Sequence, residues 1–250
     1  MSNLVAGESP KTRRSKNLAI LALMLALTIF FCFFPITFPG GISLAFMILP
    51  LLLIAQGYDF KMTIILGVLM ATVNQIAWYS TKAGNPLAPV WQNPLVCMVP
   101  RILIGVVSYF VGLGLRKAFL RPKYIITDSH KELVNKKQIY AIDGVISGVS
   151  TALGVVTNTL FCALFTIILY NGKTIVNLKN STHIDLKYIL TWFGINFLIE
   201  IIAFSILVPP IIVALRQARL VPPPKMGKEI IVDDFSSKSE NVEEAKVEKE

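Results

Sequence analysis

The sequence predicts an all-α integral membrane protein, a six-transmembrane-helix bundle with cytoplasmic N- and C-termini. Apolar residues make up 54% of the 250 residues and charged residues only 16%, and the mean hydropathy is +0.64. This composition is more apolar and less charged than that of a soluble domain. Several apolar runs also reach the ~17 to 25 residues that a helix needs to cross a bilayer.

Five apolar runs have the length of a membrane span, and a sixth is shorter. We expect the sixth, 42–55, to be tilted, shielded by neighbouring helices or matched by a thinner bilayer, because the hydrocarbon core is ~30 Å thick. A basic cytoplasmic segment, 1–16, precedes a membrane domain that covers 17–219. The expected spans are 17–34, 42–55, 62–79, 94–115, 140–170 and 186–208.

The distribution of basic residues predicts the orientation. With six spans, sixteen lysines and arginines up to Lys228 fall on the side of the N-terminus and four fall in the opposite loops. Cytoplasmic loops carry the excess of basic residues, so the N-terminus is expected inside. Omitting the short second span would destroy this agreement.

The end of the chain differs in composition from the membrane domain. Pro209 and Pro210 are expected to kink or end the last span. Residues 229–250 contain eight acidic and three basic residues, a composition typical of disorder. We therefore expect 220–250 to be a disordered cytoplasmic tail, first proline-rich and then acidic.

Several functional classes are disfavoured by the residues present. The net charge of +9 is not gathered into a basic patch with exposed aromatics, so nucleic acid is not an expected partner. The three cysteines lie in apolar runs and the two histidines are far apart, so no metal site is expected. No carboxylate pair or Ser/His/Asp arrangement favours catalysis, and no cofactor is predicted.

Charge inside a membrane span is costly and indicates function by default, and Arg101 and Glu200 are two clear cases in the expected spans. Arg101 lies about two turns below the outer end of its helix. Glu200 lies nearer the middle of the last span, four residues after Asn196 and so on the same face. The two charges either pair across the bundle, or Arg101 binds a ligand carboxylate or phosphate through its planar fork.

Other polar and aromatic residues have two interpretations each. Asn158 either hydrogen-bonds to a neighbouring helix or faces a cavity, and Gln75, near the outer end of its span, has the same alternatives. Trp78 borders an outer loop, where it either anchors the helix at the interface or stacks over a ligand.

A narrow stripe of small residues lies on the first span. Ala19, Ala22 and Ala26 are spaced by three and four residues, which allows close approach of another helix. Internal packing and a partner subunit explain this stripe about equally well.

Three stretches resemble one family of transport proteins. Residues 93–105 are similar to the NPLVxxxPRIxxG signature of substrate-binding S-components of energy-coupling-factor (ECF) vitamin transporters. Residues 154–159 resemble a GxxTNT motif, and 196–210 resemble an NxxxE…VPxI motif, of the pantothenate-type branch. The likeness runs from about Asn17 to Arg219.

The resemblance implies a multi-pass protein of the bacterial plasma membrane that captures a water-soluble vitamin on its outer face. Its partners would be a transmembrane T-component and two cytoplasmic ATPases, which fits the lack of a nucleotide-binding motif in this chain. In this family an AxxxA stripe on helix one contacts the T-component, and Ala22 to Ala26 matches that stripe.

The resemblance also implies roles for the polar residues. Ligand or pocket roles fall on Asn93, Arg101, Asn158 and Asn196, and Arg101 would meet the carboxylate of pantothenate. Riboflavin, folate or thiamine are alternative substrates. A structural or assembly subunit without a ligand is the alternative from another class, whereas a lipid-modifying enzyme lacks the clustered acidic or histidine residues that it would need.

Overall fold

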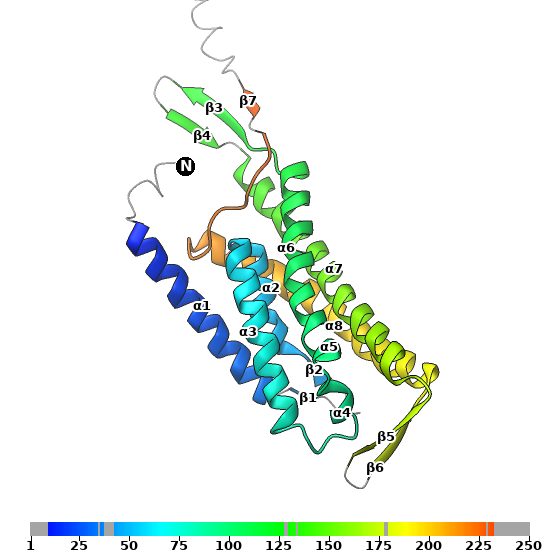
Figure 1. The fold of residues 1–250 in the computed structure, drawn as a ribbon. Helices are drawn as coiled ribbons and strands as arrows, with labels where there is room; N and C mark the ends of the chain where they lie inside the picture. Colours follow the sequence, from blue (N-terminus) through cyan, green and yellow to red (C-terminus); the bar gives the residue numbers. More distant parts are fainter. Residues whose placement is uncertain are drawn as a thin grey trace, which may run out of the picture.

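The protein is described from a computed structural model that covers residues 10–34, 36–37, 43–127, 130–133, 135–177, 180–228 and 230–232. Within these ranges five helical segments are long and apolar enough to cross a membrane, as the sequence predicts. They form an elongated bundle (Figure 1). The segments are α1 (Pro10–Phe33), α3 (Phe60–Tyr79), α5 with α6 (Pro94–Cys97 and Val99–Phe119), α7 (Lys136–Tyr170) and α8 (Leu186–Gln217).

The short sixth apolar segment is shielded by protein. It consists of the 3₁₀ helix η2 (Phe46–Ile48) and α2 (Leu49–Gly57). Every residue from Pro50 to Gln56 is buried, and α2 packs against α1, α3, α6 and α8. Because its neighbours rather than lipid surround it, α2 does not need the length of a full span.

Small sheets lie at the two ends of the bundle (Figure 1). At the end that holds the start of α1, β3 (Lys123–Thr127) pairs with β4 (His130–Leu133) and with β7 (Ile230–Val232). At the other end β5 (Lys173–Asn177) pairs with β6 (Asn180–Ile184), and β1 (Ile36–Thr37) pairs with β2 (Ser43–Leu44). These hairpins were not expected from the hydropathy pattern.

Two helix boundaries differ from the expected spans. The first helix begins at Pro10 rather than at residue 17, because proline suits the first helical position and lysine and arginine favour a helix beyond the apolar core. The last helix continues through Pro209 and Pro210 to Gln217. Pro209 packs against α7, where a Cβ added to Gly148 would lie 3.3 Å from Pro209 Cγ.

The expected disorder of 220–250 does not hold for its first part. Residues 220–228 pack in extended form on the bundle and lead into β7, where Ile230–Val232 runs parallel to β3. Val221 is buried against Gly57, where an added Cβ would come within 2.6 Å of Val221 Cγ1. Prolines favour this extended form, but the residues that it packs against, such as Gly57 and Leu120, belong to other parts of the chain. Residues 233–250, and residues 1–9 at the other terminus, lie outside the described residues.

Lys225 fastens this extended segment to the helices. Its Nζ donates to the Tyr109 hydroxyl at 3.2 Å and to the Asp59 carboxylate at 3.1 Å. The hydrogen bond with Tyr109, and after it the one with Asp59, raise the pKa of Lys225. The Gly227 N–H also donates to the Leu120 carbonyl at 2.8 Å.

Helices α6 and α7 approach closely at Gly154. A Cβ added there would lie 2.2 Å from Ser108 Oγ and 3.2 Å from the Ile104 carbonyl oxygen. Ser108 in turn donates to the Ser150 carbonyl at 3.0 Å. Only a residue without a side chain fits this contact, which gives the first glycine of the GxxTNT stretch a packing role.

Gly154→Ala is expected to lower the free energy of unfolding by about 1–3 kcal/mol, because the added methyl overpacks the interface. Ser108→Ala in the same background should restore part of the loss by removing the clashing hydroxyl. Gly114→Ala is the control, since nothing lies within 4 Å of a Cβ at that position. Denaturant unfolding in detergent measures all four proteins, and an unchanged Gly154→Ala midpoint would contradict the packing role.

Candidate functional site

The turn that enters α5 positions several polar residues at the end of the bundle opposite the start of α1 (Figure 1). Asn93 caps α5 by accepting the Leu95 N–H on Oδ1 at 3.0 Å. Its Nδ2 donates to the hydroxyl of Tyr170, the last residue of α7, at 3.3 Å. That hydroxyl donates to the Pro89 carbonyl at 3.3 Å. Asn93 therefore ties the end of α7 to the turn above Arg101.

Arg101 is buried near the start of α6 with 7% of its surface exposed. Its Nη1 donates to the Cys97 carbonyl at 2.7 Å, and the guanidinium lies 5.0 Å over the Trp91 ring. Its Nε is buried and has no hydrogen-bond partner among the residues that the structure describes. A buried guanidinium with a free donor is suited to a ligand carboxylate.

Glu200 is also buried, but it does not neutralise Arg101 through a direct contact. Among the described residues no ion pair joins the two side chains. The Glu200 carboxylate faces the backbone N–H of Ala45, and the Cys162 thiol lies within electrostatic range of both charged groups. The pairing alternative thus has no direct salt bridge in this structure.

An aromatic stack joins Arg101 to a second cation. The Trp78 and Trp91 rings stack at 5.5 Å with an interplanar angle of 12°. Lys82 Nζ lies 5.3 Å from the centre of the Trp78 ring, and the Arg101 guanidinium lies 5.0 Å from the centre of the Trp91 ring. Burial lowers the pKa of Lys82. The electron-rich ring faces stabilise both cations.

Two further polar atoms at this end have no hydrogen-bond partner within the described part of the chain. Gln75 Nε2 donates to the Gln92 carbonyl at 2.6 Å, but its Oε1 is buried without a donor. Trp78 Nε1 is buried without an acceptor. Arg101 Nε and Trp78 Nε1 are therefore two free donors, and Gln75 Oε1 is one free acceptor, in and around the aromatic stack. Because unmade buried hydrogen bonds are costly, such groups favour a ligand.

The remaining asparagines lie on α7 and α8. Asn158 Oδ1 accepts from the Cys162 thiol at 3.8 Å, and the same thiol lies 3.7 Å from the Val96 carbonyl. Asn158 is therefore linked to the α5 turn through one neighbour. Asn196 is partly buried on α8, one turn before Glu200. The structure thus gathers Gln75, Trp78, Asn93 and Arg101 at this end of the bundle, which is the candidate outer site in the expected orientation, and places Asn158 one side chain away from them.

A small apolar cavity lies beside Trp91. Leu87, Val90, Tyr188 and Phe193 are among its walls, and its volume of about 10 Å³ is close to the space of one water molecule. The stacked arrangement of Trp78 and Trp91 is therefore tightly packed on this side. A ligand larger than one water molecule does not fit into this cavity.

A second buried polar cluster, the inner ion network, was missed by the sequence reasoning. It contains Gln56, Arg116, Asp143, Ser147 and Arg216. Arg116 donates to Asp143 at 2.7 Å, to Gln56 Oε1 at 2.7 Å and to Ser147 at 2.8 Å, while Arg216 donates to Asp143 and to the Gln56 carbonyl. The two arginines had been counted as loop charges, although an aspartate inside the expected span 140–170 was a usable signal.

The alanine stripe lies on a face of α1 that the other described residues leave exposed. Ala19, Ala22 and Ala26 are all exposed, and only 11% of the most apolar 18 residues of α1 are buried. Helix α1 also lies at one edge of the bundle (Figure 1). The stripe is thus available to lipid or to another helix, and it does not pack inside the bundle.

The comparison with protein families decides what this bundle is. A family model described as "ECF transporter, substrate-specific component" matches residues 16–212. The chain belongs to this family. A substrate-specific component is the substrate-binding subunit of a transporter and not an enzyme. Membership implies a small-molecule substrate, a T-component and ATPase subunits as partners, and a multi-pass position in the membrane.

No curated protein matches this substrate-specific component significantly. The family match covers every residue of the candidate outer site and of the alanine stripe, and all of the inner ion network except Arg216. The resemblance seen in the sequence is therefore confirmed at the level of the ECF substrate-specific family.

Proposed function

We propose that this substrate-specific component captures a carboxylate-bearing vitamin, with pantothenate as the preferred substrate, on the outer face of a bacterial plasma membrane. It then delivers the vitamin through a T-component driven by separate ATPases. Both termini are cytoplasmic in this proposal. The single observation that carries it is the buried guanidinium of Arg101, which has an unpartnered Nε and no ion pair among the described residues.

The chemistry of pantothenate matches the groups around Arg101. Its carboxylate supplies the counter-charge, and its hydroxyls and amide offer both donors and acceptors to Gln75 Oε1 and Trp78 Nε1. Asn93, Asn158 and Asn196 supply further amides at the edge of this site. Thiamine is cationic and would be repelled by Arg101.

Folate is a second candidate, favoured by a specific observation. Lys82 supplies another cation at the same end, against the Trp78 ring of the Trp78–Trp91 stack. A ligand with two carboxylates and a flat ring system would use both cations and the aromatic faces. Riboflavin would use the aromatic faces but neither cation.

Calorimetric titration of the detergent-purified full chain with pantothenate, folate, riboflavin and thiamine tests the proposal. Saturable binding of pantothenate alone is the expected result. Binding of folate alone would transfer the assignment to the second candidate, and binding of riboflavin or thiamine alone would overturn the role of Arg101. No binding of any of the four would favour a structural subunit.

For the exposed stripe of α1 we propose contact with the T-component. Ala22→Trp is expected to abolish co-purification with the T-component and the ATPases, because a large side chain prevents close helix approach. Vitamin affinity should not change, since Ala22 is exposed and distant in sequence from the outer site. Ala214→Trp, at an exposed position of α8, is the matched control, and an intact complex with Ala22→Trp would contradict this proposal.

A further inference from the structure

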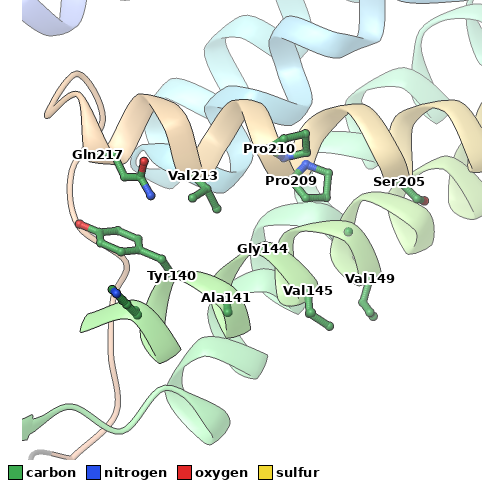
Figure 2. Close-up of a pocket in the computed structure, with 12 residues that line it drawn as sticks. Tyr140, Ala141, Gly144, Val145, Val149, Ser205, Pro209, Pro210, Val213 and Gln217 are labelled. Carbon is green, nitrogen blue, oxygen red and sulfur yellow. The ribbon is translucent and has the colours of Figure 1, made fainter. Parts of the chain in front are cut away.

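A groove runs between α7 and α8 in the half of the bundle that carries the inner ion network. Its volume is about 770 Å³. Figure 2 shows Ala141, Val145 and Val149 on α7 and Val213, Pro209 and Pro210 on α8 along its length. Gly144 and Gly148 form its floor: a Cβ at Gly144 would meet only Val213, at 3.5 Å, and one at Gly148 would meet Pro209 and the Ser205 carbonyl at 3.3 Å.

The groove opens onto the surface of the bundle and is apolar along most of its length. Val145 is 68% exposed and Val149 is 45% exposed, which is the expected state of side chains that contact lipid. From Lys137 to Val149 the groove follows α7 for ~18 Å at ~1.5 Å per residue. This length is comparable to the ~15 Å of one leaflet's hydrocarbon region.

One end of the groove is polar. Lys137 and Gln217 line it there together with the ring of Tyr140, and none of the lining residues is acidic. Tyr140 and Gln217 point toward each other across this end (Figure 2). It lies at the first turn of α7 and the last turn of α8, where a phospholipid headgroup would be.

We propose that this groove binds one anionic phospholipid of the leaflet that faces the chain termini. The acyl chain lies over Gly144 and Gly148, and the headgroup phosphate meets Lys137. Charge complementarity favours this occupant, because a lysine beside an anionic headgroup is attractive whereas the apolar walls fit hydrocarbon. A partner helix would fill the apolar part but would leave the charge of Lys137 unused.

Native mass spectrometry of the detergent-purified full chain tests the proposal. The protein is incubated with equal amounts of phosphatidylglycerol and phosphatidylcholine that carry identical acyl chains, and the retained lipids are counted. One retained phosphatidylglycerol per chain is expected. Retention of both lipids in equal amounts, or of neither, would overturn the assignment.

Five variants separate the headgroup contact from the acyl groove. Lys137→Gln should reduce the preference for phosphatidylglycerol about fivefold, whereas Lys136→Gln, which removes the neighbouring lysine outside the groove, should not. Gly144→Leu should abolish retention of either lipid by filling the floor, and Gly114→Leu, at an open position of α6, should not. Ala141→Phe fills the groove from its exposed side and should also abolish retention of either lipid. It replaces Gly144→Leu in the test if that variant does not fold.

Two results would overturn the phospholipid site. Equal effects of Lys137→Gln and Lys136→Gln would mean attraction by general surface charge. Loss of the T-component from Gly144→Leu or Ala141→Phe with lipid retention unchanged would mean that the groove is a subunit interface.

Discussion

Arg101→Ala is expected to weaken vitamin binding by at least about 30-fold, which corresponds to the loss of ~2 kcal/mol or more when one partner of a buried charged contact is removed. The ligand carboxylate would then be desolvated without its counter-charge. Arg101→Lys should give an intermediate affinity, because lysine keeps the charge but lacks the planar fork. Calorimetric titration with the vitamin that binds the wild-type protein measures both variants.

The stability of the same variants distinguishes a ligand site from a structural ion pair. If Arg101 serves the ligand, Arg101→Ala should unfold at the same denaturant concentration as the wild type or a higher one, since an unpaired buried charge is costly without substrate. If Arg101 and Glu200 stabilise each other, the variant should lose about 3–5 kcal/mol. Arg121→Ala, at an exposed position at the opposite end, is the control.

An Arg101→Ala protein with wild-type affinity would contradict the assigned site. The vitamin would then bind without using the buried guanidinium. The free Nε of Arg101 and its stacking on Trp91 would in that case be features of packing alone.

Asp143→Ala is expected to cost about 3–5 kcal/mol of unfolding free energy, because it leaves two buried arginines without a carboxylate. Arg116 and Arg216 are 4% and 5% exposed, and Asp143 is fully buried. The three side chains and Gln56 join α2, α6, α7 and α8. Loss of these contacts should therefore destabilise the half of the bundle that holds them and clearly lower the denaturant concentration at which the Asp143→Ala protein unfolds.

Arg216→Met is the matched comparison for Asp143→Ala. It removes one of the two arginines and leaves Asp143 paired with Arg116, so we expect a clearly smaller loss of stability. Vitamin affinity of the folded Asp143→Ala protein should be unchanged, since Arg116 is ~22 Å along α6 from Arg101. Equal midpoints for Asp143→Ala and the wild type would show that the inner ion network does not stabilise the fold.

Local features of the sequence were sufficient for part of the site. A charge inside an apolar run is costly, so Arg101 and Glu200 could be recognised as special from hydropathy alone. The side chains that contact Arg101 could not be identified in this way. Trp91 and Lys82 lie in the connection between two expected spans, and their contacts with Arg101 and Trp78 depend on how the turns of this connection fold back on each other.

The sequence by itself determined the membrane class, the five long apolar helices, the alanine face of α1 and the family. Each follows from patterns within one segment, because a bilayer imposes length and polarity on every helix separately. Only the tertiary structure decided that α2 is shielded, that Arg116 and Arg216 share Asp143, that α8 continues past Pro209, and that residues 220–232 pack on the bundle. These features depend on contacts between segments far apart in the chain, whose geometry no local pattern contains.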